Sequence, residues 1–450
     1  MKIIKVSLMV WISLFIYHSL SAQPNGNNLV KQIDELTNDA IAKGIFSGTV
    51  VITKDGEPFY KKQSGYADWA TKRPIADNTL YNIGSLNKQF TEEMIRQLVK
   101  EQKLDYNASL SKYINLLPAE TGNKITIQQL LDMRSGLGDY FRSPEFRDLE
   151  NTNFQLSDIL NIIKIEPLLF EPGTDRAYSN SGYAVLGAVI EKVTGKSYEE
   201  NLKERIAAPL QFKDIYYTRA EKANQPNRAF GNIIDFEGNK IGVDDISNSH
   251  PDGGTYTTIA DLLKFTEAKR QHLLPSGYDY KPAAYIGGTP PWNSLIGYTN
   301  NGYSYIVMCN VGDSADKIGP RIGSILKGEK YPPLSYPFPV TLYKMLIEKG
   351  IDYVEQNIND LCRQDNKRYD DRFLDFYGYA FLNGGKSDIA IELFTLNTKL
   401  FPNIPQTFDS LAAAYLKSGD KANARKNYNK VLELDPRNER VKDALRNLGN

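Results

Sequence analysis

A serine and a lysine three residues apart stand at the start of a predicted helix. Ser85 and Lys88 lie in the stretch YNIGSLNKQFT, residues 81–91. Apolar residues follow at helical spacing from Phe90 to Val99, which predicts a helix beginning at Ser85. Side chains three residues apart share one helix face, so the lysine amine comes within reach of the serine hydroxyl. Because a serine needs a neighbouring base in order to attack, this spacing predicts an activated serine nucleophile.

The Ser-x-x-Lys pattern alone is common, and this chain contains four further matches. They begin at Ser109, Ser314, Ser324 and Ser418. The match at residue 85 differs because a glycine precedes it, a helix follows it, and two partner motifs come later in the chain. The alternative interpretation is an ordinary helix start with a solvated lysine.

A second motif, Tyr178-Ser179-Asn180, precedes another predicted helix. A phenol beside a lysine ammonium loses its proton more easily and can act as a base towards Ser85. The amide of Asn180 can hydrogen-bond both a lysine and a substrate amide. Tyr298-Thr299-Asn300 has the same pattern, so the motif alone is weak. Its alternative interpretation is a turn with a half-buried tyrosine.

The composition narrows the function classes. The 450 residues suffice for two or three domains, and the 54 basic residues balance the 54 acidic ones. A balanced charge gives no reason to expect nucleic acid or an anionic membrane as a partner. Cys309 and Cys362 are too few for a disulfide framework, and three histidines give little basis for a metal site. We expect no metal and no cofactor, and we interpret His250 as a surface residue.

Residues 1–22 have the features of a signal peptide. Lys2 and Lys5 precede a mostly apolar run from Val6 to Tyr17, and Leu20-Ser21-Ala22 offers a small-residue cleavage site. The apolar run is short for a membrane span. We therefore expect an exported protein, periplasmic or secreted, with no integral membrane span in the mature chain. The alternative is an uncleaved N-terminal anchor.

Strands at the two ends of the first 330 residues, with helices between them, predict an antiparallel sheet flanked by helices plus a helical lobe. The N-terminal strands form a hairpin whose turn is Asp55-Gly56, a strong two-residue turn. The predicted elements at the two ends are a helix at Leu29–Lys43, strands at Phe46–Thr53 and Pro58–Gln63, a strand at Ser304–Cys309 and a helix at Ile318–Leu326.

The C-terminal part of the chain repeats itself with a period of 34 residues. The matched pairs are Ala380 and Ala414, Gly385 and Gly419, Ala390 and Ala424, Phe394 and Tyr428, and Pro402 and Pro436. Small residues where two helices cross, a glycine at the turn and a proline after the second helix are typical of tetratricopeptide repeats. A looser helix pair at Thr341–Cys362 can be a degenerate first repeat. Such repeats expose a concave surface, so a protein partner is possible.

Residues from about 46 to 325 resemble the class C β-lactamase superfamily, which includes D-stereospecific peptidases and family VIII esterases. The matching stretches are YNIGSLNKQFT, ITIQQLLDMRSGLGDY, FEPGTDRAYSNSGY, APL at 208–210 and DGGTYTTIADLLKF. The resemblance implies that Ser85 is the acylated nucleophile and that Lys88 and Tyr178 are its proton-transfer partners. It also implies that Asn180 is the polar residue of the second motif.

The third motif of that superfamily is Lys, His or sometimes Trp, then any residue, then Gly, on a strand beside the nucleophile. Its best match here is Tyr285-Ile286-Gly287. Relatives often read His-x-Gly-Gly-x-Pro-Gly, so Tyr285 and Pro291 are departures. The resemblance implies an oxyanion hole formed by the backbone N–H groups of Ser85 and Gly288. The departures leave the substrate class open.

Taken together, the sequence predicts an α+β fold like that of β-lactamases and penicillin-binding proteins, followed by an all-α repeat tail. The expected parts are a signal peptide at 1–22, a serine hydrolase domain at 23–330, a proline-rich linker at 331–340 and the repeats at 341–450. The predicted function is hydrolysis of a small ester, amide or peptide through an acyl-enzyme, as in esterases, D-peptidases or β-lactamases. The alternative is a catalytically degenerate homologue that binds peptide, cell-wall material or protein without turnover.

Overall fold

The computed structural model describes residues 26–149, 152–243, 246–289, 291–312, 314–364 and 370–448. The signal peptide predicted at residues 1–22 lies outside these ranges. Among the described residues, no helix combines the length and the apolar character that crossing a bilayer requires.

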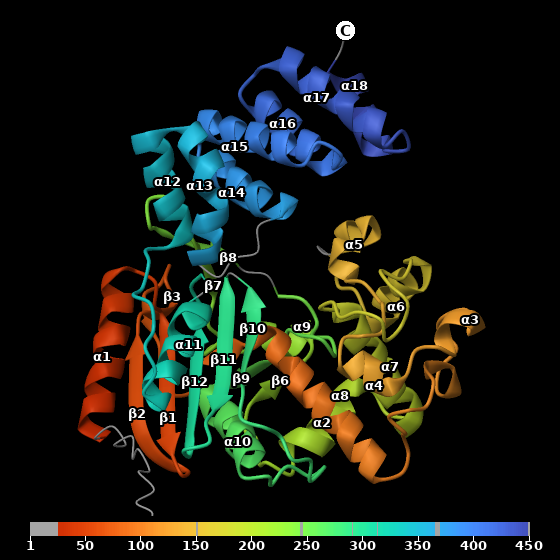
Figure 1. The fold of residues 1–450 in the computed structure, drawn as a ribbon, viewed down its shortest axis with the longest axis vertical. Helices are drawn as coiled ribbons and strands as arrows, with labels where there is room; N and C mark the ends of the chain where they lie inside the picture. Colours follow the sequence, from red (N-terminus) through yellow and green to blue (C-terminus); the bar gives the residue numbers. More distant parts are fainter. Residues whose placement is uncertain are drawn as a thin grey trace, which may run out of the picture.

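A five-stranded antiparallel sheet organises the first 330 residues (Figure 1). Its strand order is β10 (Ala284–Thr289), β11 (Trp292–Tyr298), β12 (Tyr303–Cys309), β1 (Gly48–Lys54) and β2 (Glu57–Ser64). The predicted hairpin is therefore β1–β2, and the predicted late strand is β12, which pairs with β1 along its whole length. The predicted antiparallel sheet is confirmed.

Two hydrophobic cores cover the two faces of this sheet. On one face α1 (Gly26–Ala42) and α11 (Ser314–Lys327) pack on Val50, Ile52 and Val307. On the other face the core contains Ile306 and Met308 of the sheet together with the apolar residues of α2 (Asn87–Lys100) and α10 (Ile259–Arg270). The segment that carries Ser85 is thus anchored beneath the sheet.

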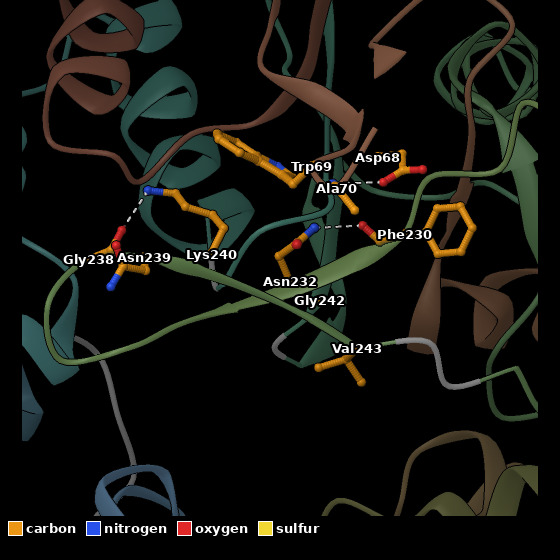
Figure 2. Close-up of a pocket in the computed structure, with 10 residues that line it drawn as sticks. All are labelled: Asp68, Trp69, Ala70, Phe230, Asn232, Gly238, Asn239, Lys240, Gly242 and Val243. Carbon is orange, nitrogen blue, oxygen red and sulfur yellow. Dashed lines mark hydrogen bonds between the residues drawn. The ribbon is translucent and has the colours of Figure 1, made fainter. Parts of the chain in front are cut away.

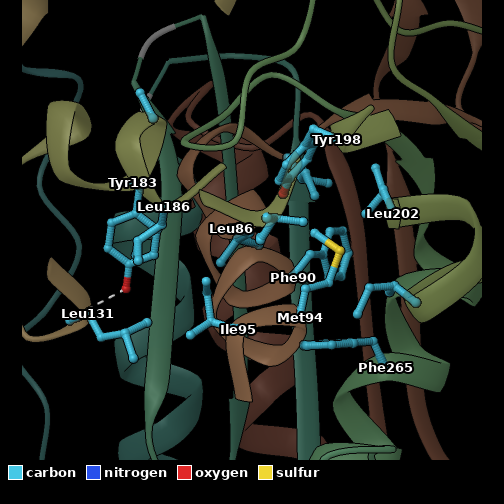
Figure 3. Packing of buried hydrophobic residues seen from close by; sticks show 14 of the residues in the cluster. Leu86, Phe90, Met94, Ile95, Leu131, Tyr183, Leu186, Tyr198, Leu202 and Phe265 are labelled. Atoms are coloured by element: carbon cyan, nitrogen blue, oxygen red, sulfur yellow. Dashed lines mark hydrogen bonds between the residues drawn. The ribbon is translucent and has the colours of Figure 1, made fainter. Parts of the chain in front are cut away.

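Helix α2 lies at the centre of the second core (Figure 3). Its apolar residues Phe90, Met94 and Ile95 are fully buried, as the helical spacing predicted. Phe90 meets Phe265 of α10 edge to face, with ring centroids 4.8 Å apart. This packing holds the N-terminal end of α2 in a fixed place.

A helical lobe lies beside α2, as predicted. It contains α3 (Ala119–Gly122), α4 (Ile127–Leu131), α5 (Pro144–Leu149), α6 (Leu156–Ile165), α7 (Asn180–Thr194), α8 (Tyr198–Leu202) and α9 (Arg219–Ala223). Three small sheets complete this part of the chain: β3 (Tyr66–Asp68) with β4 (Arg73–Pro74), β5 (Leu80–Asn82) with β9 (Tyr256–Thr258) and β6 (Ile215–Tyr216), and β7 (Gly231–Ile234) with β8 (Lys240–Val243).

The tail is all helical, and its predicted repeats are confirmed. The helices are α12 (Phe338–Lys349), α13 (Ile351–Gln364), α14 (Asp371–Asn383), α15 (Ser387–Leu400), α16 (Pro405–Lys417), α17 (Lys421–Leu434) and α18 (Glu439–Asn447). Gly385 and Gly419 join the two helices of each repeat with φ of 79° and 89°, a conformation that favours glycine.

The tail packs on the rest of the molecule through the turn between β7 and β8. Phe236 in this turn stacks on Phe381 of α14 and lies against Tyr343 of α12, with ring centroids 5.0 Å apart in both pairs. Phe236 is buried and belongs to the hydrophobic core of the tail. The repeats therefore share part of their core with a hairpin of the preceding domain.

Candidate active site

Ser85 lies in a single 3-10 turn, Gly84–Leu86, between β5 and α2. The sequence predicted that the α-helix begins at Ser85, but it begins at Asn87. The first turn is bonded i→i+3 instead, with the N–H of Leu86 donating to the oxygen of Ile83 at 3.1 Å. Gly84, which opens this turn, has a left-handed φ of 51°. A side chain at this position would also place its Cβ 2.2 Å from the backbone nitrogen of Gly288. Gly84 thus allows the turn to approach β10 closely.

The ammonium group of Lys88 is buried against three oxygen atoms. Its Nζ lies 3.0 Å from Ser85 Oγ, 2.6 Å from Asn180 Oδ1 and 2.6 Å from the backbone oxygen of Asp252. The side chain is only 3% exposed. An ammonium has three protons to donate, and these three contacts use all of them. Lys88 is therefore held in one position, directed at the serine.

Tyr178 approaches Ser85 from the side of the lobe. Its hydroxyl donates to Ser85 Oγ at 2.7 Å, and Lys88 Nζ lies 5.0 Å from the centre of its ring. The side chain is 52% exposed, so this wall of the site is open to solvent. A phenol in this position can exchange a proton with the serine and is electrostatically coupled to the lysine.

Asn180, the first residue of α7, connects Lys88 to the lobe. While its Oδ1 accepts from Lys88, its Nδ2 donates to both carboxylate oxygens of Asp139 at 3.1 Å. These bonds fix the orientation of the amide. Ser179 caps α7 by accepting from the nitrogen of Gly182. The structure thus brings together four of the predicted residues through hydrogen bonds that span 92 and 93 residues of the chain.

The predicted third motif lies on β10, against the turn of Ser85. A Cβ on Gly287 would lie 2.3 Å from the backbone nitrogen of Leu86, so only glycine permits this contact. Gly288 has a φ of 89° and packs against Gly84. The two backbone amides implied as the oxyanion hole, those of Ser85 and Gly288, therefore belong to segments in direct contact.

Tyr285 is half buried and does not carry a charge at neutral pH. Burial raises the pKa of its phenol to about 12, and the phenol shares a hydrogen bond with Tyr298. The face of its ring lies 4.0 Å from the Nζ of Lys269 on α10. The sequence did not identify Lys269, because a lysine in a helix gives no local sign that it is buried.

Two further residues are buried behind the site: Asp252, which was not identified from the sequence, and His250, which was misjudged. Asp252 is buried behind Lys88; burial raises the pKa of its carboxyl group, whose Oδ2 accepts from the Tyr140 hydroxyl at 3.0 Å. The interpretation of His250 as a surface residue is wrong. Its ring is 6% exposed and stacks on Phe154 with a centroid distance of 4.7 Å. The cause is the tight packing of the 247–255 loop beneath the lobe.

A cavity of about 790 Å³ lies away from Ser85, between the β3–β4 and β7–β8 hairpins (Figure 2). Trp69, Phe230, Asn232 and Lys240 line it. None of these residues hydrogen-bonds to Ser85, Lys88 or Tyr178 in the described part of the chain. No residue named for the site around Ser85 lines this cavity.

Similar proteins share this fold. Penicillin-binding protein 4* of Bacillus subtilis (strain 168) is 29% identical over 54% of this chain, which spans only 56% of that protein. The octameric penicillin-binding protein homologue from Pyrococcus abyssi superposes with a TM-score of 0.60 at 24% identity, covering 71% of this chain and 82% of that one. D-amino acid amidase from Ochrobactrum anthropi SV3 gives 0.56 at 22% identity, covering 67% and 99%.

Family comparison separates the chain into two matched regions. The tetratricopeptide repeat family matches residues 405–438, within the helical tail. The Beta-lactamase family matches residues 27–326, which include the sheet, the lobe and every residue of the site. A match of this extent shows that the chain belongs to the Beta-lactamase family, with a tetratricopeptide repeat in its C-terminal tail.

Proposed function

We propose that this protein is a serine hydrolase that forms an acyl-enzyme on a neutral ester or amide. The observation that carries the proposal is the position of Ser85 Oγ, which lies 2.7 Å from the Tyr178 hydroxyl and 3.0 Å from Lys88 Nζ. A hydroxyl between a phenol and an amine has both a route for its proton and a partner that stabilises the resulting charge.

In the proposed reaction, Tyr178 acts as a phenolate stabilised by the Lys88 ammonium, and it takes the proton of Ser85 Oγ as this oxygen attacks the substrate carbonyl. The backbone N–H groups of Ser85 and Gly288 stabilise the negative oxygen of the tetrahedral intermediate. The same proton then goes to the leaving alcohol or amine, whose bond to the carbonyl carbon breaks. Water repeats these steps on the acyl-enzyme and releases the acid, and Ser85 recovers its proton.

The site favours substrates without a carboxylate near β10. Tyr285 stands where relatives often place a cation, and its phenol is neutral because its pKa is about 12. Arg321 cannot replace that cation, since its guanidinium donates to the backbone oxygens of Pro332 and Pro333. A charge-assisted hydrogen bond contributes about 1.5–3 kcal/mol against about 1 for a neutral one. We therefore expect small neutral esters to be hydrolysed better than penicillins.

Covalent labelling with a fluorescent phosphonate tests the proposal directly. The wild-type protein should be labelled, and Ser85→Ala should abolish the label while changing the melting temperature little. Ser109→Ala is the matched control, because Ser109 begins another Ser-x-x-Lys match and should leave labelling intact. Persistent labelling of Ser85→Ala would refute the assignment. An unlabelled wild-type protein would favour the alternative, a homologue that binds peptide or cell-wall material without turnover.

Export, domain division and partner binding complete the proposal. We propose that residues 1–22 direct export and that the hydrolase domain, 23–330, is joined by residues 331–340 to the repeat domain, 341–450. Tetratricopeptide repeats have the capacity to bind proteins, and the tail supplies such repeats. Fractionation of cells and N-terminal sequencing of the mature protein test the first point, since cleavage is expected before Gln23.

A further inference from the structure

A buried lysine that the proposed reaction does not use lies beside the site. Lys269 on α10 is completely buried. Its Nζ donates to Gln89 Oε1, and the faces of Tyr280 and Tyr285 lie 4.1 Å and 4.0 Å from it. An amide oxygen and two aromatic faces therefore surround the ammonium, in place of the carboxylate partner that a buried charge usually needs.

The nearby carboxylates are engaged by other donors. Glu92 binds Arg96 through two hydrogen bonds, and Glu93 accepts from Ser276, Gln97 and Tyr280. The charged and titratable groups that face Lys269 are Glu92, Glu93 and Arg96 on α2, Tyr280 in the loop before β10, and Tyr285 on β10. Burial is the main reason why the pKa of Lys269 falls to about 8.

Two of the three contacts of Lys269, those with Gln89 and Tyr285, belong to the two segments that form the proposed oxyanion hole. Gln89 lies on α2, next to Lys88 and four residues after Ser85. Tyr285 lies on β10, two residues before Gly287 and three before Gly288. An ammonium held between these side chains links the nucleophile segment to the strand that carries the second oxyanion donor.

We propose that Lys269 is a positioning residue whose ammonium, acting through Gln89 and Tyr285, fixes β10 against α2 and so aims the amide of Gly288 at the oxyanion. The inference rests on the proposed hydrolase function. The resemblance implies a cation on the strand itself, whereas here the cation lies behind a tyrosine of that strand. A misdirected oxyanion donor weakens stabilisation of the transition state but not binding of the substrate. Its loss therefore lowers kcat and leaves KM nearly unchanged.

Lys269→Met removes the charge and keeps a similar volume. For a neutral ester, kcat should fall about tenfold at pH 6.5, where the wild-type lysine is charged. The ratio of wild-type to variant kcat should approach one above pH 9, because the wild-type lysine is then neutral. Lys222→Met is the matched control: Lys222 is also buried, donates to the backbone oxygen of Ser247 and lies over an aromatic ring, that of Tyr256. The ratio of wild-type kcat to the kcat of Lys222→Met should not change with pH.

Gln89→Glu gives Lys269 a carboxylate partner and provides a second test. An ion pair favours the charged lysine, so the alkaline fall of kcat should move upward by at least one pH unit. Either of two results would overturn the proposal. One is a ratio of wild-type to Lys269→Met kcat that stays constant with pH, and the other is an alkaline fall of kcat that occurs at the same pH in Gln89→Glu as in the wild type.

Hydrogen exchange gives a readout that does not depend on turnover. At pH 7 a peptide covering β10 should exchange faster in Lys269→Met than in the wild type, while a peptide covering β12 should be unchanged. Equal exchange in β10 would also overturn the proposal. If the phosphonate fails to label Ser85 in the wild type, the hydrolase function is refuted. Hydrogen exchange in β10 would still decide whether Lys269 positions the strand.

Discussion

Replacement of His250 should change how the protein responds to acid. Burial, assisted by the nearby charge of Lys222, lowers the pKa of His250 from 6.5 to about 3. Because the folded state disfavours the protonated ring, the unfolded chain binds one more proton between these two values. The contribution of the neutral ring is therefore complete above pH 6.5 and is lost as the pH falls towards 3.

The size of this effect follows from the pKa shift. Each pKa unit corresponds to 1.36 kcal/mol, so lowering the pH from 7.5 to 4.5 should remove about 3 kcal/mol of unfolding free energy through His250 alone. His250→Phe keeps an aromatic ring against Phe154, which stacks on the histidine at 4.7 Å, and abolishes the titration. The variant should therefore lose about 3 kcal/mol less than the wild type over this pH range.

Urea unfolding followed by far-ultraviolet circular dichroism at pH 7.5, 6.0 and 4.5 measures the difference. His272→Phe is the matched control, because the side chain of His272 is 51% exposed and pairs with Asp279 at the surface. Parallel pH dependences of wild type and His250→Phe would refute the reasoning. They would show that the ring is protonated in the folded protein or that the 247–255 loop opens at no cost.

Three further predictions concern the site and the tail. Lys88→Ala and Tyr178→Phe should each slow acylation by several orders of magnitude, and the double variant should be scarcely slower than either, since the effects of groups on one proton path are strongly non-additive. Burst kinetics with a chromogenic ester measure the acylation rate. Multiplicative losses in the double variant would contradict a shared path. Tyr285→His should raise the ratio of penicillin to neutral-ester hydrolysis, more at pH 5.5 than at 7.5, because a charged imidazole can bind a carboxylate. Efficient penicillin hydrolysis by the wild type would contradict the expected preference for neutral esters. Ending the chain after Pro339 should leave ester turnover within a few-fold once the uncovered Phe236 is replaced by serine, whereas aggregation of that doubly altered protein would show that the repeats complete the core of the hydrolase domain.

The elements with strong local chemistry could be predicted from the sequence. Asp55 and Gly56 both have positive φ, 53° and 92°, as a tight hairpin turn requires, and the pair is visible in the sequence. The repeats were visible because their small residues and turn glycines recur at a fixed period. These features depend on a few neighbouring residues, so no knowledge of the rest of the fold was needed.

The contacts between distant segments could not be predicted in the same way. The approach of Asn180 to Lys88 was expected only through resemblance to a family, because no local rule joins residues 92 positions apart. Nothing in the sequence indicated that His250 and Lys269 are buried, since a polar residue in a loop or a helix is usually exposed. The start of α2 was misplaced by two residues because the apolar spacing does not distinguish a first turn bonded i→i+3, as at 84–86, from an α-helical one.

The pairing of β1 with β12 has a consequence for how the chain is made. Ser47, just before β1, donates a buried hydrogen bond to Asn310, 263 residues later. During synthesis the inner strand β1 therefore has β2 on one side and no neighbour on the other until residues beyond 309 have left the ribosome. Such late closure slows folding and exposes an unpaired strand edge that invites aggregation. One edge of β1 therefore stays unpaired for almost the whole time that the first 309 residues are being synthesised.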